Sequence, residues 1–436
     1  MMKVQDHSLM DPNIQESPFA YYDALLEQAP VYFMPEINAF VISKYKDIQY
    51  VVAHPEIWSI DMRSLPAAQL IKHPAAQKIL VEEGFPRDTK FTTDPPVHTN
   101  YRVAVRNAFS PVRVKALADF VQTAVDELID DMRGKSECEF MQQFCWWLPM
   151  RVITQLLGVP YEDAGLIKHW SDVWVEPLTY GLTEEREIIV AREEVALQKY
   201  LLKHLDEKRR NPGADVLTDM LNARTPEGNP LPISEIVGLS EHLIVGGHET
   251  ATSALGAGMA ILAQNPGIAA ELRADPSLVE NFVEEVLRTE SPSQGFFRIA
   301  VQDYEMRGVK IPKGAMVHIR FAAANRDPEQ FDHPAKFDLH RTNGKTHLAF
   351  SQGVHHCIGS PYARLELNTA FRSLLAAFDD IRLTPGHETL SHVPGLSLRT
   401  LKAVHISYRT RAHRRRQTCR SAFPARLSRS TPSRRC

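Results

Sequence analysis

The segment at residues 234–264 constrains the fold of this 436-residue chain more than any other. Its middle is apolar or small on nearly every face of a helix, and Asn265 and Pro266 end the pattern. A helix without a polar face is stable in water only when other elements surround it. Its weakly apolar stretch, residues 251–263, is shorter than the roughly 20 residues that a membrane-spanning helix needs. We therefore predict a large domain packed around a central helix, with no transmembrane anchor.

The rest of the chain adds mostly helices to this centre. Apolar residues at three- and four-residue steps, or an apolar face, predict helices at residues 18–28, 117–132, 184–210, 278–289 and 361–378. Short β-like runs predict strands at residues 30–33, 39–43, 297–301, 309–311 and 315–319, of which the first two should form a hairpin. No Ser/Gly linker divides this region, so we predict one domain over residues 1–408, mainly α with small β-sheets.

Residues 409–436 differ in composition from everything before them. They contain ten arginines and no acidic residue, so the preceding residues carry a formal charge of −13 within the total of −3. Rich in Arg, Ser and Pro and without an apolar period, this tail should be disordered. Five cysteines without a CxxC pair exclude a disulfide scaffold and a zinc ribbon. The start has no apolar signal segment, and we expect a cytoplasmic protein.

One cysteine lies in a distinctive loop. Cys357 stands between Gly353 and Gly359, seven residues after Phe350 and directly before a predicted helix. Glycines let the backbone approach a flat cofactor, and N–H groups ahead of a helix stabilise a thiolate, so the loop suits metal ligation by sulfur. The commoner alternative for a lone cysteine is a buried structural thiol, and a nucleophile would need a separate activating histidine. A zinc site formed by His355, His356 and Cys357 is disfavoured, because three adjacent residues cannot easily occupy three corners of one tetrahedron.

The central helix carries a second signal, the run Gly-Gly-His-Glu-Thr-Ala-Thr at residues 246–252. Glycine in a helix interior costs about 1 kcal/mol relative to alanine, which implies a compensating role. The Thr250 hydroxyl can bond the Gly246 carbonyl and, with Glu249, place an alcohol and an acid side by side as a proton relay. The alternative is close helix packing with Glu249 in a structural ion pair. A metalloprotease HExxH motif is excluded because position 252 is threonine.

Three weaker signals complete the pattern. Glu285 and Arg288 share one helical face, an arrangement that usually gives a surface ion pair of little value. His98 and Arg102 also share a face and suit a carboxylate ligand, although a solvated helix start explains them equally well. Arg298, within an apolar strand, is another candidate for a buried carboxylate contact.

In this order the motifs resemble the cytochrome P450 family over essentially residues 18–408. The family's FxxGxxxCxG motif supplies the axial thiolate of haem and matches Phe350, Gly353, Cys357 and Gly359. Its (A/G)Gx(D/E)T motif, matched at 246–250, delivers protons to dioxygen and implies catalytic roles for Glu249 and Thr250. This resemblance implies the P450 fold, a single large haem domain.

Further roles follow from the same resemblance. It implies that His98, Arg102, Arg298 and His355 hold the haem propionates. The ExxR motif, Glu285 and Arg288, implies a structural ion pair, with Arg341 as a candidate third member. Departures from the family pattern are small: Ser351 stands where a second glycine is frequent, Ala251 follows the relay threonine where many relatives have threonine, and Tyr362 replaces a common leucine.

The resemblance implies a haem-thiolate monooxygenase that contains haem b, uses O2 and hydroxylates a small hydrophobic substrate such as a terpenoid, steroid, fatty acid or aromatic compound. Electrons would come from NAD(P)H through a ferredoxin reductase and a ferredoxin, the latter docking at basic residues such as Arg106, Arg113, Lys345 and Arg364. We expect a monomer and no nucleic-acid partner. Alternatives are a peroxide-driven haem peroxygenase and a non-catalytic haem-binding protein.

The resemblance also indicates where a substrate pocket would lie. Loop residues 64–93, residues 170–182 and the 395–398 turn should contribute to it. The individual candidates are Leu243, Val245, Gly246, Phe296 and Leu396.

Overall fold

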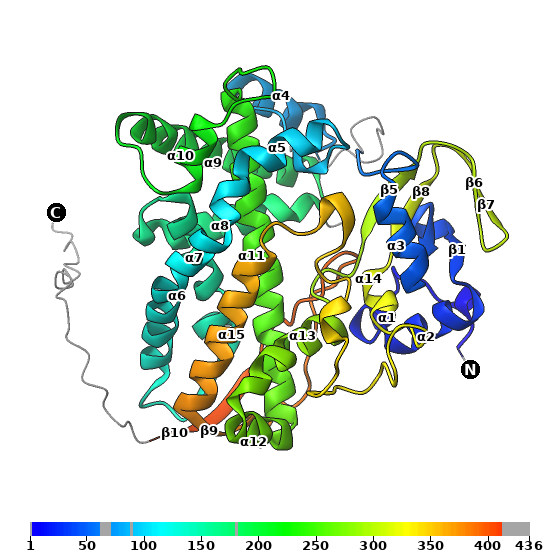
Figure 1. The fold of residues 1–436 in the computed structure, drawn as a ribbon, viewed down its shortest axis with the longest axis vertical. Coiled ribbons are helices and arrows are strands. Elements are labelled where there is room, and N and C mark those ends of the chain that lie inside the picture. The colour runs from blue at the N-terminus through cyan, green and yellow to red at the C-terminus, as the bar shows by residue number, and fades with distance from the viewer. Residues whose placement is uncertain (1, 62–70, 88–89, 179–181, 412–436) are drawn as a thin grey trace.

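The computed structural model describes residues 2–61, 71–87, 90–178 and 182–411. Helix α11, Ile233–Gln264, runs through the middle of the molecule, as its apolar pattern predicts (Figure 1). Its small residues allow close packing in the second half, where Gly256 lies against Met141 and Gly258 against Phe371. A Cβ at either glycine would overlap these side chains, so the glycines there serve packing alone.

Two groups of helices enclose α11. The largest hydrophobic cluster joins its C-terminal half to α6, α7, α13 and α15, and a second cluster joins its N-terminal half to α5, α8, α9 and α10. The bounds of these helices are α5 Val97–Val105, α6 Pro111–Met132, α7 Trp147–Leu157, α8 Ala164–Val175, α9 Glu184–Arg210, α10 Val216–Asn222, α13 Val279–Glu290 and α15 Ser360–Ala377. The remaining helices are α1 Pro12–Glu16, α2 Phe19–Gln28, α3 Tyr45–Ala53, α4 Pro74–Glu83, α12 Pro266–Ala274 and α14 Phe321–Ala324.

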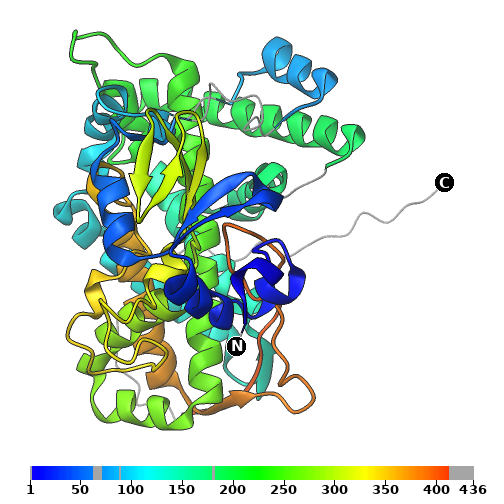
Figure 2. The same cartoon turned by 90° about the vertical axis from the view of Figure 1, so that its right-hand side faces the viewer.

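A five-stranded sheet lies beside this helical part, as Figures 1 and 2 show. Its order is β1-β2-β8-β5-β3, from β1 Val31–Met34, β2 Ala39–Ile42, β8 Met316–Ile319, β5 Phe296–Ala300 and β3 Trp58–Ser59. The predicted hairpin is confirmed, with β1 antiparallel to β2, whereas β2 and β8 run parallel. The small sheets comprise β4 Glu137–Glu139, β10 His405–Thr410 and β9 Phe378–Leu383, and the pair β6 Tyr304–Met306 and β7 Val309–Ile311.

The first residues of the predicted tail, Arg409 and Thr410, belong to strand β10. β10 continues through Thr410, and the Arg411 N–H donates to the Ala377 carbonyl at 2.9 Å. Arg409 also contacts Asp380 at 2.9 Å, so its charge is used within the sheet. Ordered structure therefore extends beyond residue 408, and the rest of the predicted tail, residues 412–436, lies outside the described residues.

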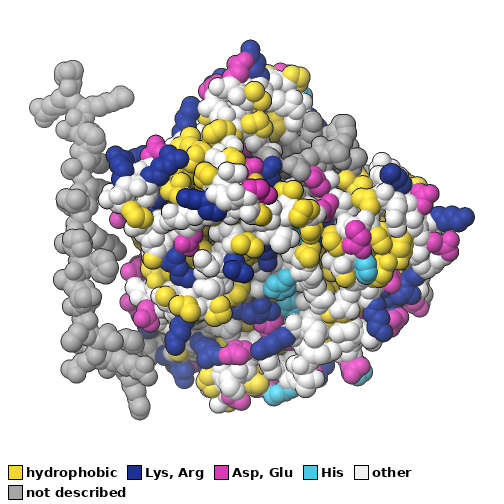
Figure 3. All heavy atoms as spheres, turned by 45° about the horizontal axis from the view of Figure 1, so that its top comes forward, with side chains coloured by type: hydrophobic (Ala, Val, Ile, Leu, Met, Phe, Trp, Pro, Cys, Tyr) yellow, Lys and Arg dark blue, Asp and Glu magenta, His cyan; other side chains and the backbone are white. Residues whose placement is uncertain are grey.

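The apolar stretches of the described helices are too short to cross a membrane, and the surface of the protein carries charges of both signs. In the part of the chain that the structure describes, no helix is long and apolar enough to cross a membrane. Figure 3 shows one face of the molecule, on which Lys and Arg are interspersed with Asp and Glu.

Candidate functional site

The cysteine loop is shaped by its glycines and by helix α15. Gly353 has a left-handed φ of 70°, and a Cβ there would lie against the Val52 carbonyl oxygen, so glycine is required on both grounds. Ser351 also adopts a left-handed φ of 57°, which explains why a glycine suits this position. The Cys357 N–H donates to the Phe350 carbonyl at 2.9 Å and closes the loop just before α15.

The Cys357 thiol is exposed and lies among groups that favour its anion. Desolvation by the surrounding protein raises the pKa of Cys357, which opposes thiolate formation. The backbone N–H groups of Gly359 and Ser360 and the charges of Arg102 and Arg364 act in the opposite direction. A bound metal cation would add to the second set and hold the sulfur as thiolate.

Four donor side chains from three distant segments meet beside this loop. His98 and Arg102 come from α5, Arg298 from β5 and His355 from the turn before Cys357. The rings of His98 and His355 lie 4.1 Å apart, centre to centre. The sequence predicted these four residues as propionate contacts, and the structure brings them together.

This cluster carries excess positive charge. Burial, together with the charge of Arg102, lowers the pKa of His98 to about 4. Burial and the charges of His98, Arg298 and Arg102 lower the pKa of His355 to about 3. Arg298 is 2% exposed, and burial lowers its pKa to about 10 despite the charge of Asp94. His98 Nδ1 and His355 Nε2 are buried without hydrogen-bond partners among the described residues. The donors therefore suit an anionic group with several carboxylate oxygens.

Helix α11 places an alcohol and an acid on adjacent residues. The Thr250 Oγ1 donates to the Gly246 carbonyl at 3.0 Å, as predicted from the spacing. Gly246 and Gly247 are exposed although α11 is mostly buried. A Cβ at Gly246 would meet no atom within 4 Å, so packing within the protein does not explain this glycine. Close approach of a flat group does.

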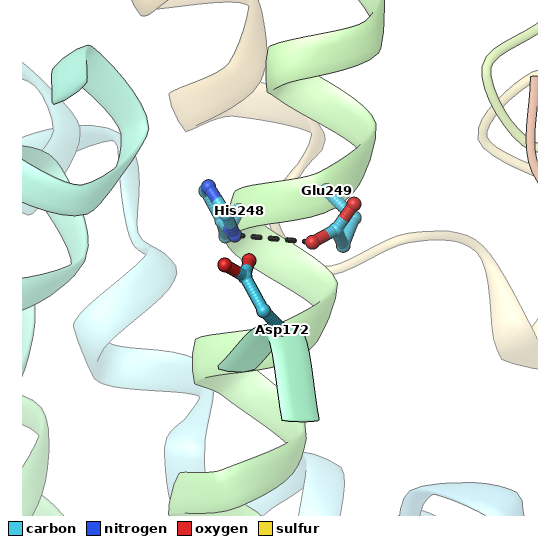
Figure 4. Close-up of side chains that lie close together, drawn as sticks. All are labelled: Asp172, His248 and Glu249. Atoms are coloured by element: carbon cyan, nitrogen blue, oxygen red, sulfur yellow. Dashed lines mark ion pairs between the residues drawn. The ribbon is translucent and has the colours of Figure 1, made fainter. Parts of the chain in front are cut away.

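Glu249 pairs with His248 on its own helix, and Asp172 of α8 lies beside this pair, as Figure 4 shows. His248 Nδ1 lies 3.3 Å from Glu249 Oε1, and the Asp172 carboxylate points toward the same imidazole. Desolvation works to raise the pKa of Glu249, but His248 and the charge of Lys168 outweigh it and lower the pKa. His248, Glu249 and Asp172 could surround a cation, but Lys168 Nζ already contacts Asp172 at 2.6 Å. The group is therefore a network of two carboxylates, one lysine and one histidine.

Lys168 and Asp172 are functional neighbours that the sequence analysis missed. Both lie on α8, more than 75 residues before Glu249, and a charged pair four residues apart on a helix is an ordinary surface pattern. No local signal in the sequence distinguishes them.

The Glu285–Arg288 pair is buried, not solvated, with its side chains 1% and 0% exposed. Arg288 binds both Glu285 carboxylate oxygens at 2.7 and 2.9 Å. Arg341 Nε lies 3.0 Å from Glu285 Oε1, so the candidate third member is in place. The remaining Arg288 N–H groups donate to backbone carbonyls of the segment between α14 and the cysteine loop.

Comparison with known proteins decides the family. The family model described as cytochrome P450 matches residues 174–403. The chain is 33% identical over 374 residues to a putative cytochrome P450, YjiB, from Bacillus subtilis (strain 168), an overlap of 84% of this chain and 90% of that protein.

The chain belongs to the cytochrome P450 family.

Two further relatives agree with this assignment. The chain is 32% identical over 412 residues to the cytochrome P450 monooxygenase PikC from Streptomyces venezuelae, covering 93% of this chain and 94% of PikC. The crystal structure of CYP109E1 from Bacillus megaterium in complex with corticosterone matches with a TM-score of 0.78 at 28% identity, covering 91% of this chain and 99% of that one. The chain is accordingly a cytochrome P450 monooxygenase, of a family that uses haem and O2.

The residues present fit haem. Two arginines and two histidines, the latter with buried unpaired ring nitrogens, match the two propionate carboxylates of a porphyrin. Cys357 offers an accessible thiol beside them. It is close enough to Arg102 for its negative charge to act on the pKa of that arginine. The surface of α11 at Gly246, where a Cβ would meet no atom within 4 Å, suits a planar ring.

The predicted pocket residues divide into two groups. Phe296 is 48% exposed, and Val245 and Gly246 are at least partly accessible. Leu243 and Leu396 are 8% and 6% exposed and pack into hydrophobic clusters. That their side chains also line the pocket stays a prediction. The loop and helix-end regions predicted to contribute lie partly outside the described residues, at 62–70, 88–89 and 179–181.

Proposed function

We propose that this protein is a haem-thiolate monooxygenase in which Cys357 ligates the haem iron and Thr250 and Glu249 serve the side on which O2 binds. Its substrate is a small hydrophobic molecule, and its electrons come from a ferredoxin and a ferredoxin reductase. The observation that carries the proposal is the meeting of His98, His355, the half-buried Arg102 and the buried Arg298 beside an accessible cysteine. That donor set matches a cofactor that carries carboxylates and a metal within reach of the cysteine.

Each residue group has a separate task. When bound, haem supplies oxygen activation, and the thiolate favours O–O cleavage. The four propionate donors fix the position of the cofactor. Because the Thr250 hydroxyl hydrogen is committed to the Gly246 carbonyl, its oxygen can accept a hydrogen bond from a water. Glu249, connected to Asp172 and Lys168 through His248, can replace a proton lost from that water.

An 18O2 incubation tests the proposal. Holoenzyme, ferredoxin, ferredoxin reductase and NADPH are combined with a panel of terpenoids, steroids, fatty acids and aromatic compounds. We expect one 18O atom in each product molecule. A product formed only with added peroxide would favour a haem peroxygenase instead, and the absence of any O2-dependent product would favour a haem-binding protein. Steroids and macrocyclic compounds belong among the compounds tested. CYP109E1 was solved in complex with corticosterone, and another relative is named 6-deoxyerythronolide B hydroxylase.

A Thr250→Ala variant should keep its haem, but its NADPH consumption should be uncoupled from product formation. Without the hydroxyl, the water beside Glu249 loses its hydrogen-bond acceptor, and proton delivery becomes slow or misdirected. We expect product formed per NADPH to fall about tenfold or more, with the missing electrons recovered as hydrogen peroxide. Product, NADPH and peroxide are measured together.

Ser253→Ala is the matched control for this variant. Ser253 lies three residues further along α11, and its hydroxyl donates to the Glu249 carbonyl and contacts Thr400. Its loss should leave the coupling ratio near that of the unmodified protein. Equal ratios in the two variants would refute the role assigned to Thr250.

Arg106 is the best single test of ferredoxin docking. Tyr362, five residues after Cys357, donates to the Ala108 carbonyl at 2.7 Å, which places the exposed Arg106 on the cysteine side of the molecule. Arg113 and Arg364 are already paired with Asp219 and Glu284. An Arg106→Glu variant should raise the KM for ferredoxin about tenfold at low salt, with the difference shrinking as salt rises. A KM that responds to neither the substitution nor salt would refute the docking site.

A further inference from the structure

A buried polar cluster lies where the segment after α4 meets α8, α9 and the N-terminal half of α11. We call Arg87, Trp174, Glu194, Gln198 and Glu241 the Arg87 cluster. Arg87 follows α4, Trp174 belongs to α8, Glu194 and Gln198 to α9, and Glu241 to α11. Arg87 Nε donates to Glu194 Oε2 at 2.6 Å, and the Arg87 guanidinium lies 4.3 Å from the centre of the Trp174 ring.

The hydrogen bonding of this cluster is incomplete. Glu194 and Glu241 are 2% and 1% exposed, yet Oε1 of each carboxylate has no partner among the described residues. Both terminal nitrogens of Arg87 and the Trp174 Nε1 are also unpaired within the described part of the chain. Gln198 does not supply these contacts to Arg87, because it forms two hydrogen bonds with the Phe85 backbone, at 2.7 and 3.0 Å. Buried polar atoms are rarely left unpaired, so five in one place call for a partner that the described residues do not supply.

The charges identify the missing group. Two buried carboxylates face one guanidinium, so the ionised cluster lacks one positive charge. Desolvation and the charge of Glu194 raise the pKa of Glu241 well above its ordinary value, against the opposing charge of Arg87 and a hydrogen bond with Gln198. Desolvation likewise raises the pKa of Glu194, despite its contact with Arg87. A second cation would balance both acids, whereas an anion would add to the imbalance.

The cluster is within reach of the oxidation site. Glu241, Val245 and Glu249 follow one another at four-residue steps and therefore lie along one face of α11. At 1.5 Å per residue, Glu241 is about 12 Å from Glu249 along the helix axis. Val245, between them, is partly exposed. A molecule that contacts both Glu241 and the surroundings of Thr250 would therefore have to be elongated.

We propose that the Arg87 cluster is a recognition site for a positively charged nitrogen of the substrate. The natural substrate is then an elongated apolar molecule with an amine about 12 Å from the carbon that is oxidised. Glu241 and Glu194 bind the ammonium group, and the terminal nitrogens of Arg87 donate to oxygen atoms of the substrate next to it. This inference rests on the proposed monooxygenase function, since it names the substrate class of the same site.

The test compares three probes of similar length by calorimetric titration of the holoenzyme. Choline octanoate carries a trimethylammonium group that cannot ligate iron, its 3,3-dimethylbutyl analogue replaces that group with a neutral one of the same shape, and dodecanoate carries a carboxylate. We expect the choline ester to bind at least about tenfold more tightly than its neutral analogue, and dodecanoate to bind most weakly. A Glu241→Gln variant should reduce the tenfold preference to less than about threefold, because it keeps the shape of the side chain and removes its charge.

Glu185→Gln is the matched control, since it removes one exposed acid from the same helix as Glu194 and should retain the preference. Equal binding of the two esters, tighter binding of dodecanoate, or no binding of any probe would overturn the inference. So would a Glu241→Gln variant that changes the melting temperature but not the preference, as expected of a purely structural cluster. A carbon monoxide spectrum of the same sample tests the haem-thiolate function separately, because calorimetry does not depend on it.

Discussion

A Cys357→Ala variant is expected to lose the thiolate-type carbon monoxide spectrum entirely, and oxygenase turnover should fall at least about 10³-fold with it. The loop gives the sulfur two backbone N–H groups, from Gly359 and Ser360, and two nearby arginine charges, all of which stabilise a thiolate. Alanine removes the sulfur that would donate electron density to iron as a thiolate. The four propionate donors are unchanged, so we expect the variant to retain part of its haem.

The measurement is the difference spectrum of the reduced protein with and without carbon monoxide, together with haem content per chain. Cys138→Ala is the control, because Cys138 is half-buried in the small sheet formed by β4, β9 and β10 and packs against the main core. It should keep the spectrum of the unmodified protein. A thiolate-type band in the Cys357 variant, or its loss in the Cys138 variant, would contradict the ligand assignment.

Features that depend on local pattern were predictable from the sequence. The apolar character of α11 required burial, and the hairpin of β1 and β2 followed from two short runs and a turn. The predicted bond from Thr250 to the Gly246 carbonyl is present because a four-residue step fixes its geometry. The family motifs identified the residues that meet at the site, although they come from distant segments.

Features that depend on packing between distant segments were not predictable in the same way. The glycines of α11 look alike in the sequence, yet Gly258 packs against Phe371 whereas a Cβ at Gly246 would contact no atom. Leu243 and Leu396 pack into two different hydrophobic clusters, and these contacts depend on segments far away in the sequence. Arg87 meets Glu241 only because α4, α9 and α11 come together in the fold.

The largest effect on stability is expected from Glu285→Gln. Glu285 is 1% exposed and holds two buried guanidinium groups, those of Arg288 and Arg341. Its second oxygen also accepts the Asp338 N–H at 3.0 Å. Glutamine preserves the shape but removes the negative charge, leaving both arginines uncompensated in the protein interior.

Breaking a buried ion pair in this way typically costs about 3–5 kcal/mol, a large part of the about 5–15 kcal/mol that keeps most proteins folded. The damage should reach the haem site, because Arg288 donates to the Asn325, Pro334 and Lys336 carbonyls and so fixes the segment that leads into the cysteine loop. We therefore expect the variant to lose most of its haem as well as its stability. Urea unfolding and haem content per chain measure the two effects.

Glu280→Gln is the control, because it removes the same charge from an exposed position and so shows how much of the effect comes from burial. Glu280 lies on the same helix, α13, and pairs with Arg372 at 3.1 Å, but its side chain is 56% exposed. Exposed ion pairs contribute about 0–1 kcal/mol, so this variant should unfold at nearly the same urea concentration as the unmodified protein. If Glu285→Gln were as mild as Glu280→Gln, the buried network would not be what holds this segment, and the cysteine loop would depend on its own glycines and on α15 for its shape.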